Sequence, residues 1–195
     1  MKYIIRTVII LMFIIVNHNV YSCDCIWHGT FLEISKRVDI VLTGKVKSYD
    51  HYINIKGSSE KKATVMVIEV KDVILPLKSF ESLGIPYYKW LNNEKIKEIK
   101  IVGNIENNCR PLVGTFEIGK TYVFGLNFFK SLELHNLYGI DFYISNCGTY
   151  WLEVNNEVVV GNISDSKEQK IRKDKVNIEM NYSILKANLE SVKRD

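Results

Sequence analysis

The sequence predicts a mainly β fold: a small barrel of five strands, with one short helix before the strands and one helix after them. Segments rich in β-branched residues recur through the middle of the chain, and turn-forming residues separate them. The clearest helical patterns lie on either side of this region. Five strands flanked in this way are typical of a Greek-key barrel of the OB-fold type.

The first helix is expected just before the first strand. Residues 30–33 have the capping-box pattern, with Thr30 as the N-cap and Glu33 able to reach back to the Thr30 amide. The helix should run to about Arg37. Its apolar side is formed by Phe31, Ile34 and Val38.

The five strands follow in order, separated by polar or irregular loops. They are expected at residues 38–49, 63–74, 96–102, 120–129 and 138–145. Gly44 inside the first strand predicts a bulge or a barrel bend. Residues 51–62 read as a polar loop, and residues 151–160 as a short strand pair that turns around Asn155 and Asn156.

The C-terminal part predicts a helix packed on the barrel. Apolar residues recur there at spacings of four and three, which is a helical stripe. The stripe consists of Ile178, Tyr182, Leu185, Leu189 and Val192. A helix for a partner or a membrane surface is the alternative. We therefore divide the chain into a signal at 1–22, a barrel domain at 23–160 and a helical extension at 161–195.

Residues 1–22 have the composition of an export signal. Two basic residues precede an unbroken apolar run, and Val20 and Ser22 fit the −3 and −1 positions of a cleavage site. Cleavage before Cys23 predicts a secreted, extracytoplasmic protein. Residues 20–23 also resemble a bacterial lipobox, and acylation of Cys23 would instead anchor a lipoprotein in the cell envelope.

The charge balance argues against nucleic acid as a partner. The whole chain carries a formal charge of +4, and loss of the two basic residues of the signal leaves about +2. A charge this small and evenly spread does not suit a phosphate backbone. A membrane partner is expected only if Cys23 is lipidated.

Four cysteines in an exported chain predict two disulfides. Three pairings are possible. A bridge between Cys23 and Cys25 is unfavourable, because residues two apart in an extended segment hold their Cβ atoms too far from each other. The residue spacing does not decide between the two remaining pairings with Cys109 and Cys147.

Patterns for catalysis are weak. Residues 114–121 match the phosphate-loop pattern G-x-x-x-x-G-K-T, but a strand pattern follows Lys120 where that loop needs a helix. We therefore expect no nucleotide site, no enzyme activity and no cofactor. A metal site of Cys23, Cys25 and His28 is an alternative that disulfide formation would remove.

Taken together, these residues resemble the tissue inhibitor of metalloproteinases (TIMP) family, in its N-terminal netrin-like domain and especially in its short bacterial members. The resemblance covers about residues 23–151. It is carried by the Cys-x-Cys start, the helix leading to residues 38–46, the strand at 67–73, Cys109, the turn and strand at 116–123, and residues 145–147.

The resemblance implies the bridges Cys23–Cys109 and Cys25–Cys147. It also implies an inhibitory ridge of Cys23, Asp24, Cys25 and Ile26. In that family the amine and carbonyl of the first cysteine, here Cys23, displace water from the catalytic zinc of a protease. A zinc site with an open position can accept such a bidentate ligand.

Asp24 departs from the family pattern, since the residue in its place enters an apolar pocket of the protease. Burial of an unpaired carboxylate there is costly. The leading hypothesis is a secreted protein-binding domain that inhibits a zinc metalloprotease or binds another extracellular protein. The alternative is a binding module of the same fold, lipid-anchored at Cys23, without inhibitory activity.

Overall fold

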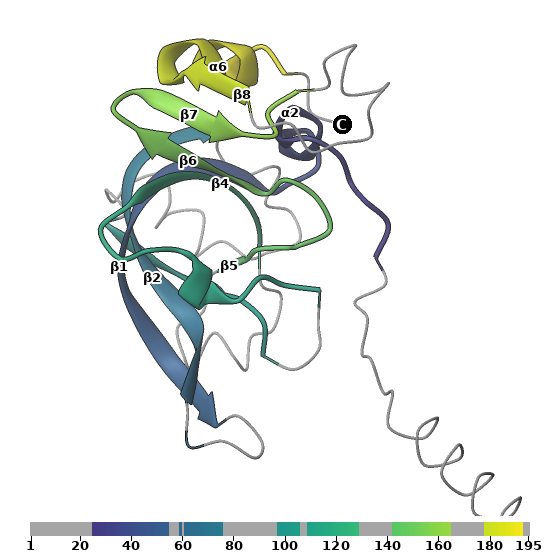
Figure 1. Ribbon diagram of the computed structural model, residues 1–195. Coiled ribbons are helices and arrows are strands. Elements are labelled where there is room, and N and C mark those ends of the chain that lie inside the picture. The colour runs from purple at the N-terminus through teal and green to yellow at the C-terminus, as the bar shows by residue number, and fades with distance from the viewer. Residues whose placement is uncertain are drawn as a thin grey trace, which may run out of the picture.

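The computed structural model describes residues 25–54, 59, 61–75, 97–105, 109–128, 142–164 and 178–192. Five strands form the barrel: β1 (Ile40–Asn54), β2 (Lys61–Leu75), β3 (Glu98–Val102), β4 (Thr121–Phe128) and β5 (Phe142–Tyr143). Their order is β1-β2-β3-β5-β4, and β4 pairs back onto β1 to close the barrel (Figure 1). The β3–β5 pairing is parallel and the others are antiparallel. The expected mainly β barrel of the OB-fold type is confirmed.

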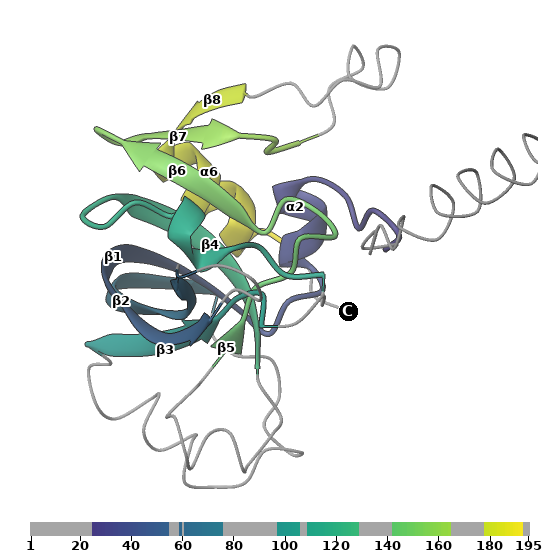
Figure 2. The same cartoon turned by 60° about the horizontal axis from the view of Figure 1, so that its bottom comes forward.

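Three further strands extend the sheet beyond the barrel. They are β6 (Trp151–Asn155), β7 (Val158–Gly161) and β8 (Ile178–Asn181), and they follow β4 in that order (Figure 2). The expected strand pair at 151–160 is confirmed as β6 and β7. Asn156 and Glu157 connect them with φ angles of 46° and 68°, which is the backbone of a tight two-residue hairpin turn.

Strands β1 and β2 form a long hairpin that bends at Gly44. The register shifts between Thr43 and Gly44, so the expected bulge is confirmed. A Cβ atom at Gly44 would lie 2.2 Å from Cγ2 of Ile68, and the absence of a side chain therefore permits the close approach of the two strands.

The expected loop at 51–62 is too long. Strand β1 continues to Asn54, and Tyr52 pairs with Ala63 on β2. Many side chains in this part of the hairpin are polar and partly exposed, so they give no alternation of buried and exposed positions. The backbone hydrogen bonds of the hairpin nevertheless extend the pairing, since they do not depend on a buried face.

The barrel encloses one large apolar core. Its largest fully buried side chains are Phe31, Phe116, Phe124, Phe142, Ile34, Ile40, Leu42, Met66, Ile68, Ile99, Ile101 and Leu126. Phe116 lies among three aromatic rings, with centroid distances of 5.4 Å to Tyr122, 5.7 Å to Phe124 and 5.1 Å to Trp151. This aromatic cluster joins the loop before β4 to β4 and β6.

Helix α2 (Phe31–Ser35) is the expected short helix. The carboxylate of Glu33 accepts a hydrogen bond from the Thr30 amide at 2.9 Å, as the capping-box pattern predicts. The α-helix ends at Ser35 and not near Arg37; a turn follows it. The apolar side is confirmed, because Phe31, Ile34 and Val38 are all buried.

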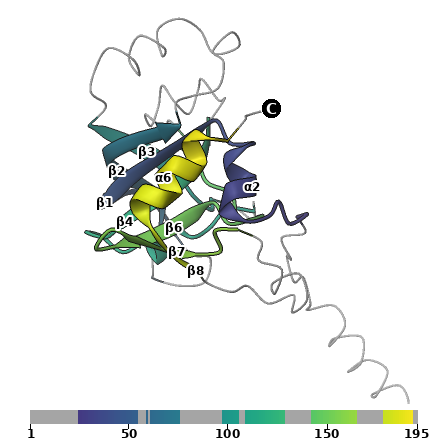
Figure 3. The same ribbon diagram turned by 90° about the horizontal axis from the view of Figure 1, so that it is seen from above.

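Helix α6 (Tyr182–Glu190) packs on the barrel, as expected, through buried Leu185 and Leu189. The helical stripe was wrong at Ile178, which belongs to β8 and pairs with Gly161 of β7. The side chain of Asn181 explains the boundary, because its Oδ1 accepts the Ser183 amide at 2.9 Å and begins the helix there. Helices α2 and α6 cover the same end of the barrel (Figure 3).

Polar contacts fasten α6 to β1 and β2. The hydroxyl group of Tyr182 is hydrogen bonded to Oγ1 of Thr43 at 2.7 Å and donates to Asp72 at 3.2 Å. The ammonium group of Lys186 donates to the same Asp72 carboxylate at 2.7 Å. These contacts favour a helix packed on its own barrel over the alternative of a helix for a partner.

The loop that matches the phosphate-loop pattern has a different structure. A 3-10 helix, η1 (Val113–Thr115), opens it, and β4 begins directly after Lys120. A strand therefore follows Lys120 in place of the helix whose N-terminus would bind phosphate. The ammonium group of Lys120 forms ion pairs with Glu117 and Glu153. The hydrogen bonds to these two carboxylates, with Glu117 contributing more, raise the pKa of Lys120.

Some expectations fall outside the described residues. These are the signal at 1–22 and the residues Cys23 and Asp24. Among the residues that the structure does describe, no helix is long and apolar enough to span a bilayer.

Candidate functional site

The candidate site is the anchored segment, residues 25–29, which precedes α2 and has no regular secondary structure. It lies along residues 147–149. The His28 amide donates to the Cys147 carbonyl at 2.6 Å, and the Thr149 amide donates to the Gly29 carbonyl at 3.1 Å. The start of the described chain is thereby held against the segment that joins β5 to β6.

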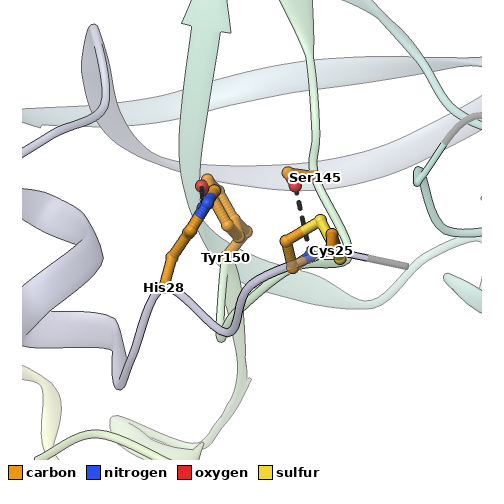
Figure 4. The surroundings of a disulfide bond; sticks show 5 residues. Cys25, His28, Ser145 and Tyr150 are labelled. Atoms are coloured by element: carbon orange, nitrogen blue, oxygen red, sulfur yellow. Dashed lines mark hydrogen bonds between the residues drawn. A yellow bond between two sulfur atoms is a disulfide. The ribbon is translucent and has the colours of Figure 1, made fainter. Parts of the chain in front are cut away.

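A disulfide between Cys25 and Cys147 provides the second attachment (Figure 4). The two residues are 122 positions apart in sequence, and their Cα atoms are 5.7 Å apart. The Cys147 amide donates to Oγ of Ser145 at 3.1 Å, which orients the end of the bridge. This is the pairing that the resemblance implies.

A third cysteine lies beside this bridge. The sulfur atoms of Cys25, Cys109 and Cys147 are all within 4.8 Å of one another. Cys109 is also disulfide-bonded, and its carbonyl accepts the Asn146 amide at 2.9 Å. The implied bridge Cys23–Cys109 includes Cys23, which lies outside the described residues.

The alternative metal site of Cys23, Cys25 and His28 is wrong at Cys25. This site would bind zinc or copper through the Cys25 thiolate, but the sulfur of Cys25 is bonded to that of Cys147. Nδ1 of His28 is instead hydrogen bonded to the Tyr150 hydroxyl at 2.7 Å. Disulfide formation therefore removes the thiolate that this site would require.

His28 and Tyr150 form a third attachment of the anchored segment. Their side chains point toward each other (Figure 4), and the rings meet edge to face with centroids 6.2 Å apart. Burial raises the pKa of the Tyr150 phenol, although a hydrogen bond from Ser145 opposes that shift. The phenol consequently stays protonated at neutral pH and keeps its hydrogen atom for bonding.

Arg110 directly follows Cys109 in the sequence, and Tyr143 precedes Cys147 by four positions. The Arg110 guanidinium is 4.7 Å from the centroid of the Tyr143 ring, within the range of a cation–π interaction. Burial lowers the pKa of Arg110, but the group remains charged at neutral pH because arginine starts from a very high value. The residue after Cys109 therefore carries a partly buried positive charge.

The ridge residues that the structure describes differ in exposure. Cys25 is half-buried by its bridge, whereas the Ile26 side chain is 85% exposed. Trp27 follows with 45% exposure. Two large apolar side chains therefore face solvent between two attachments, at Cys25 and at His28. Such side chains are the usual anchors of a protein interface.

We expect Gly29→Ala to lower the free energy of unfolding by about 2 kcal/mol. Gly29 has a φ angle of +112°, which residues with a side chain rarely adopt, and a Cβ atom there would lie 2.1 Å from Oε2 of Glu33. The new methyl group would therefore strain the backbone and displace the carboxylate that bonds to Thr30. Urea denaturation followed by circular dichroism measures the loss.

Gly114→Ala is the matched control, because a Cβ atom at that position meets nothing within 4 Å and its φ angle is not in the left-handed region. We expect a change of at most about 0.5 kcal/mol there. Equal losses in the two variants would contradict the special role of Gly29.

Sequence reasoning found Cys25 and Ile26 but did not assign Trp27, Gly29 or the His28–Tyr150 pair. A glycine immediately before the N-cap Thr30 is a signal for a sharp change of direction. No sequence signal connects His28 with Tyr150, since the two residues are separated by 122 positions.

Neither a scan against models of known protein families nor a search of curated proteins found a match to this chain.

Proposed function

We propose that this protein is a secreted, netrin-like inhibitor of zinc metalloproteases that acts through its N-terminus after cleavage before Cys23. The observation that supports the proposal is the anchored segment. Cys23 lies only two positions before Cys25, and Cys25 is covalently tied to the barrel. A free amine and carbonyl at Cys23 would complete the coordination of a catalytic zinc ion that keeps an open position.

The attachments matter because ordering a flexible chain opposes binding. Here the disulfide and the two backbone hydrogen bonds to residues 147–149 order the segment during folding, so less conformational entropy is lost in the complex. Exposed Ile26 and Trp27 supply apolar area next to the zinc ligand. No catalytic role is assigned to the protein in this proposal.

Asp24 would restrict which zinc metalloproteases the protein can inhibit. Its carboxylate would enter the specificity pocket next to the zinc ion, and an apolar pocket would leave it unpaired. The proposal therefore favours targets whose pocket offers a cation or hydrogen-bond donors. Substitution of Asp24 by leucine should shift the preference toward proteases with apolar pockets.

The test compares two proteins that differ only in whether the amine of Cys23 is free. One begins with an unmodified Cys23, and the other carries one additional alanine before Cys23. We expect the free-amine protein to inhibit members of a zinc metalloprotease panel, and the added residue to weaken inhibition by about 100-fold or more, as expected for a lost ligand contact worth roughly 3 kcal/mol.

Equal melting temperatures and the absence of alkylatable thiols in both proteins are the controls for folding and disulfide formation. Equal inhibition by the two proteins would contradict zinc chelation. No inhibition by the free-amine protein on any protease of the panel would overturn the proposed function.

A second candidate is a lipid-anchored binding module of the same fold, and Asp24 is the observation that favours it. The intact mass of the native protein separates the two candidates. An unmodified Cys23 at the N-terminus supports the inhibitor, whereas an added diacylglyceryl mass supports the lipoprotein and excludes chelation by the Cys23 amine.

A further inference from the structure

We propose that His28 and Tyr150 are positioning residues, and that the hydrogen bond between their side chains sets the direction in which the chain preceding Gly29 leaves the barrel. The pair contacts no zinc ion in this proposal and acts through the anchored segment. The part of the inference that concerns inhibition rests on the proposed function, whereas the part that concerns the segment does not.

Tyr150 is a fixed point of the barrel. Its side chain is 5% exposed, and its carbonyl accepts the amide of Gly125 in β4 at 2.8 Å. The next residue, Trp151, begins β6. A side chain that is bonded to the Tyr150 hydroxyl is therefore held relative to two strands of the sheet.

His28 connects the anchored segment to Tyr150. Its amide is bonded to the Cys147 carbonyl at 2.6 Å, and its ring is bonded to Tyr150 at 2.7 Å. His28 is thus held through its backbone and through its side chain. Without the ring bond, the stretch between the disulfide at Cys25 and the backbone bonds at His28 and Gly29 could rotate about the line that joins these attachments.

Rotation of the segment would change the exposure of Ile26 and Trp27, which lie between the attachments. Ile26 is 85% exposed and Trp27 is 45% exposed, although burial of both side chains against the barrel would be favoured by the hydrophobic effect. A third attachment opposes that collapse. The His28–Tyr150 bond thereby keeps the side chains of Ile26 and Trp27 exposed toward a partner.

The experiment uses Tyr150→Phe, which removes only the hydroxyl group, and His28→Phe, which keeps a ring. The matched control is Tyr182→Phe, because the Tyr182 hydroxyl also has a hydrogen bond of 2.7 Å, to Thr43, but lies on α6. Exchange of the amide hydrogen of residue 28, inhibition constants and melting temperatures are measured for each variant of the mature chain.

We expect Tyr150→Phe and His28→Phe each to accelerate exchange of the amide of residue 28 about 10-fold and to weaken inhibition about 10-fold, which is the effect of one partly buried hydrogen bond. The double variant should be no weaker than Tyr150→Phe alone, since both substitutions remove the His28–Tyr150 bond and Tyr150→Phe also removes the bond from Ser145. Tyr182→Phe should lower the melting temperature without changing exchange or inhibition.

A conservative variant separates positioning from stability. His28→Asn places a side-chain amide near the position of Nδ1, so this variant should retain slow exchange and most of the inhibition. Unchanged exchange in Tyr150→Phe would overturn the positioning role, whatever the protease assays show.

Faster exchange with unchanged inhibition would overturn the contribution of the pair to inhibition alone. If the wild-type protein inhibits no protease, the proposed function fails, and the exchange measurements still decide whether the pair positions the segment.

Discussion

Replacing Cys25 and Cys147 together with alanine is expected to lower the free energy of unfolding by about 4 kcal/mol or more. The bridge spans 122 positions, and a single crosslink over such a loop is worth about 4 to 5 kcal/mol in the chain-entropy model. If Cys23 and Cys109 are also joined, that second bridge shortens the path between Cys25 and Cys147 to about 40 residues. The Cys25–Cys147 bridge then closes a smaller loop, and its removal still costs about 4 kcal/mol.

The double variant is preferred because a single substitution leaves a reactive thiol close to the sulfur of Cys109. Urea denaturation at equal protein concentration gives the difference in stability, and thiol titration verifies that the remaining cysteines are still paired. A loss below about 1 kcal/mol would show that the bridge does not restrict the unfolded chain as this model assumes.

Phe116→Ala is expected to lower the free energy of unfolding by about 3 to 5 kcal/mol. The side chain is 1% exposed and lies among the rings of Tyr122, Phe124 and Trp151, with centroids 5.1 to 5.7 Å away. Removal of the ring leaves a cavity between rigid strands that cannot easily collapse. Chemical denaturation with the tryptophan fluorescence as the signal measures the loss.

Ile118→Ala is the matched control, since Ile118 lies two positions away and is 57% exposed. That substitution should change stability by at most about 0.5 kcal/mol. A comparable loss at Ile118 would contradict the assignment of Phe116 to the core and of Ile118 to the surface.

The parts of the fold that were predictable from sequence have local signals. The capping box around Thr30 and Glu33, the bulge at Gly44 and the turn at Asn156 each depend on residues close together in the chain. The start of α6 was missed, because Ile178 continues the helical spacing of Leu185 and Leu189. Its strand conformation is set by pairing with Gly161, which no local pattern reveals.

The candidate site was predictable only in part, for the same reason. A cysteine pair that directly follows the pattern of an export signal predicts long-range bridges, and the resemblance selects Cys147 as the partner of Cys25. The bond between His28 and Tyr150 depends on how β6 and α2 meet after the barrel closes. Its two partners are ordinary residues whose roles follow from tertiary structure alone.

The anchored segment has a consequence for the order of events during synthesis. Cys25 leaves the ribosome 122 positions before Cys147, a delay of roughly 6 to 25 seconds at usual rates of translation. Cys109 is made earlier than Cys147 and ends within 4.8 Å of both sulfur atoms, so it is the first downstream cysteine that Cys25 can meet. Thiol–disulfide exchange within this cluster would resolve a premature bridge. The anchored segment, although made before the barrel strands, is thus among the last parts to reach its final place.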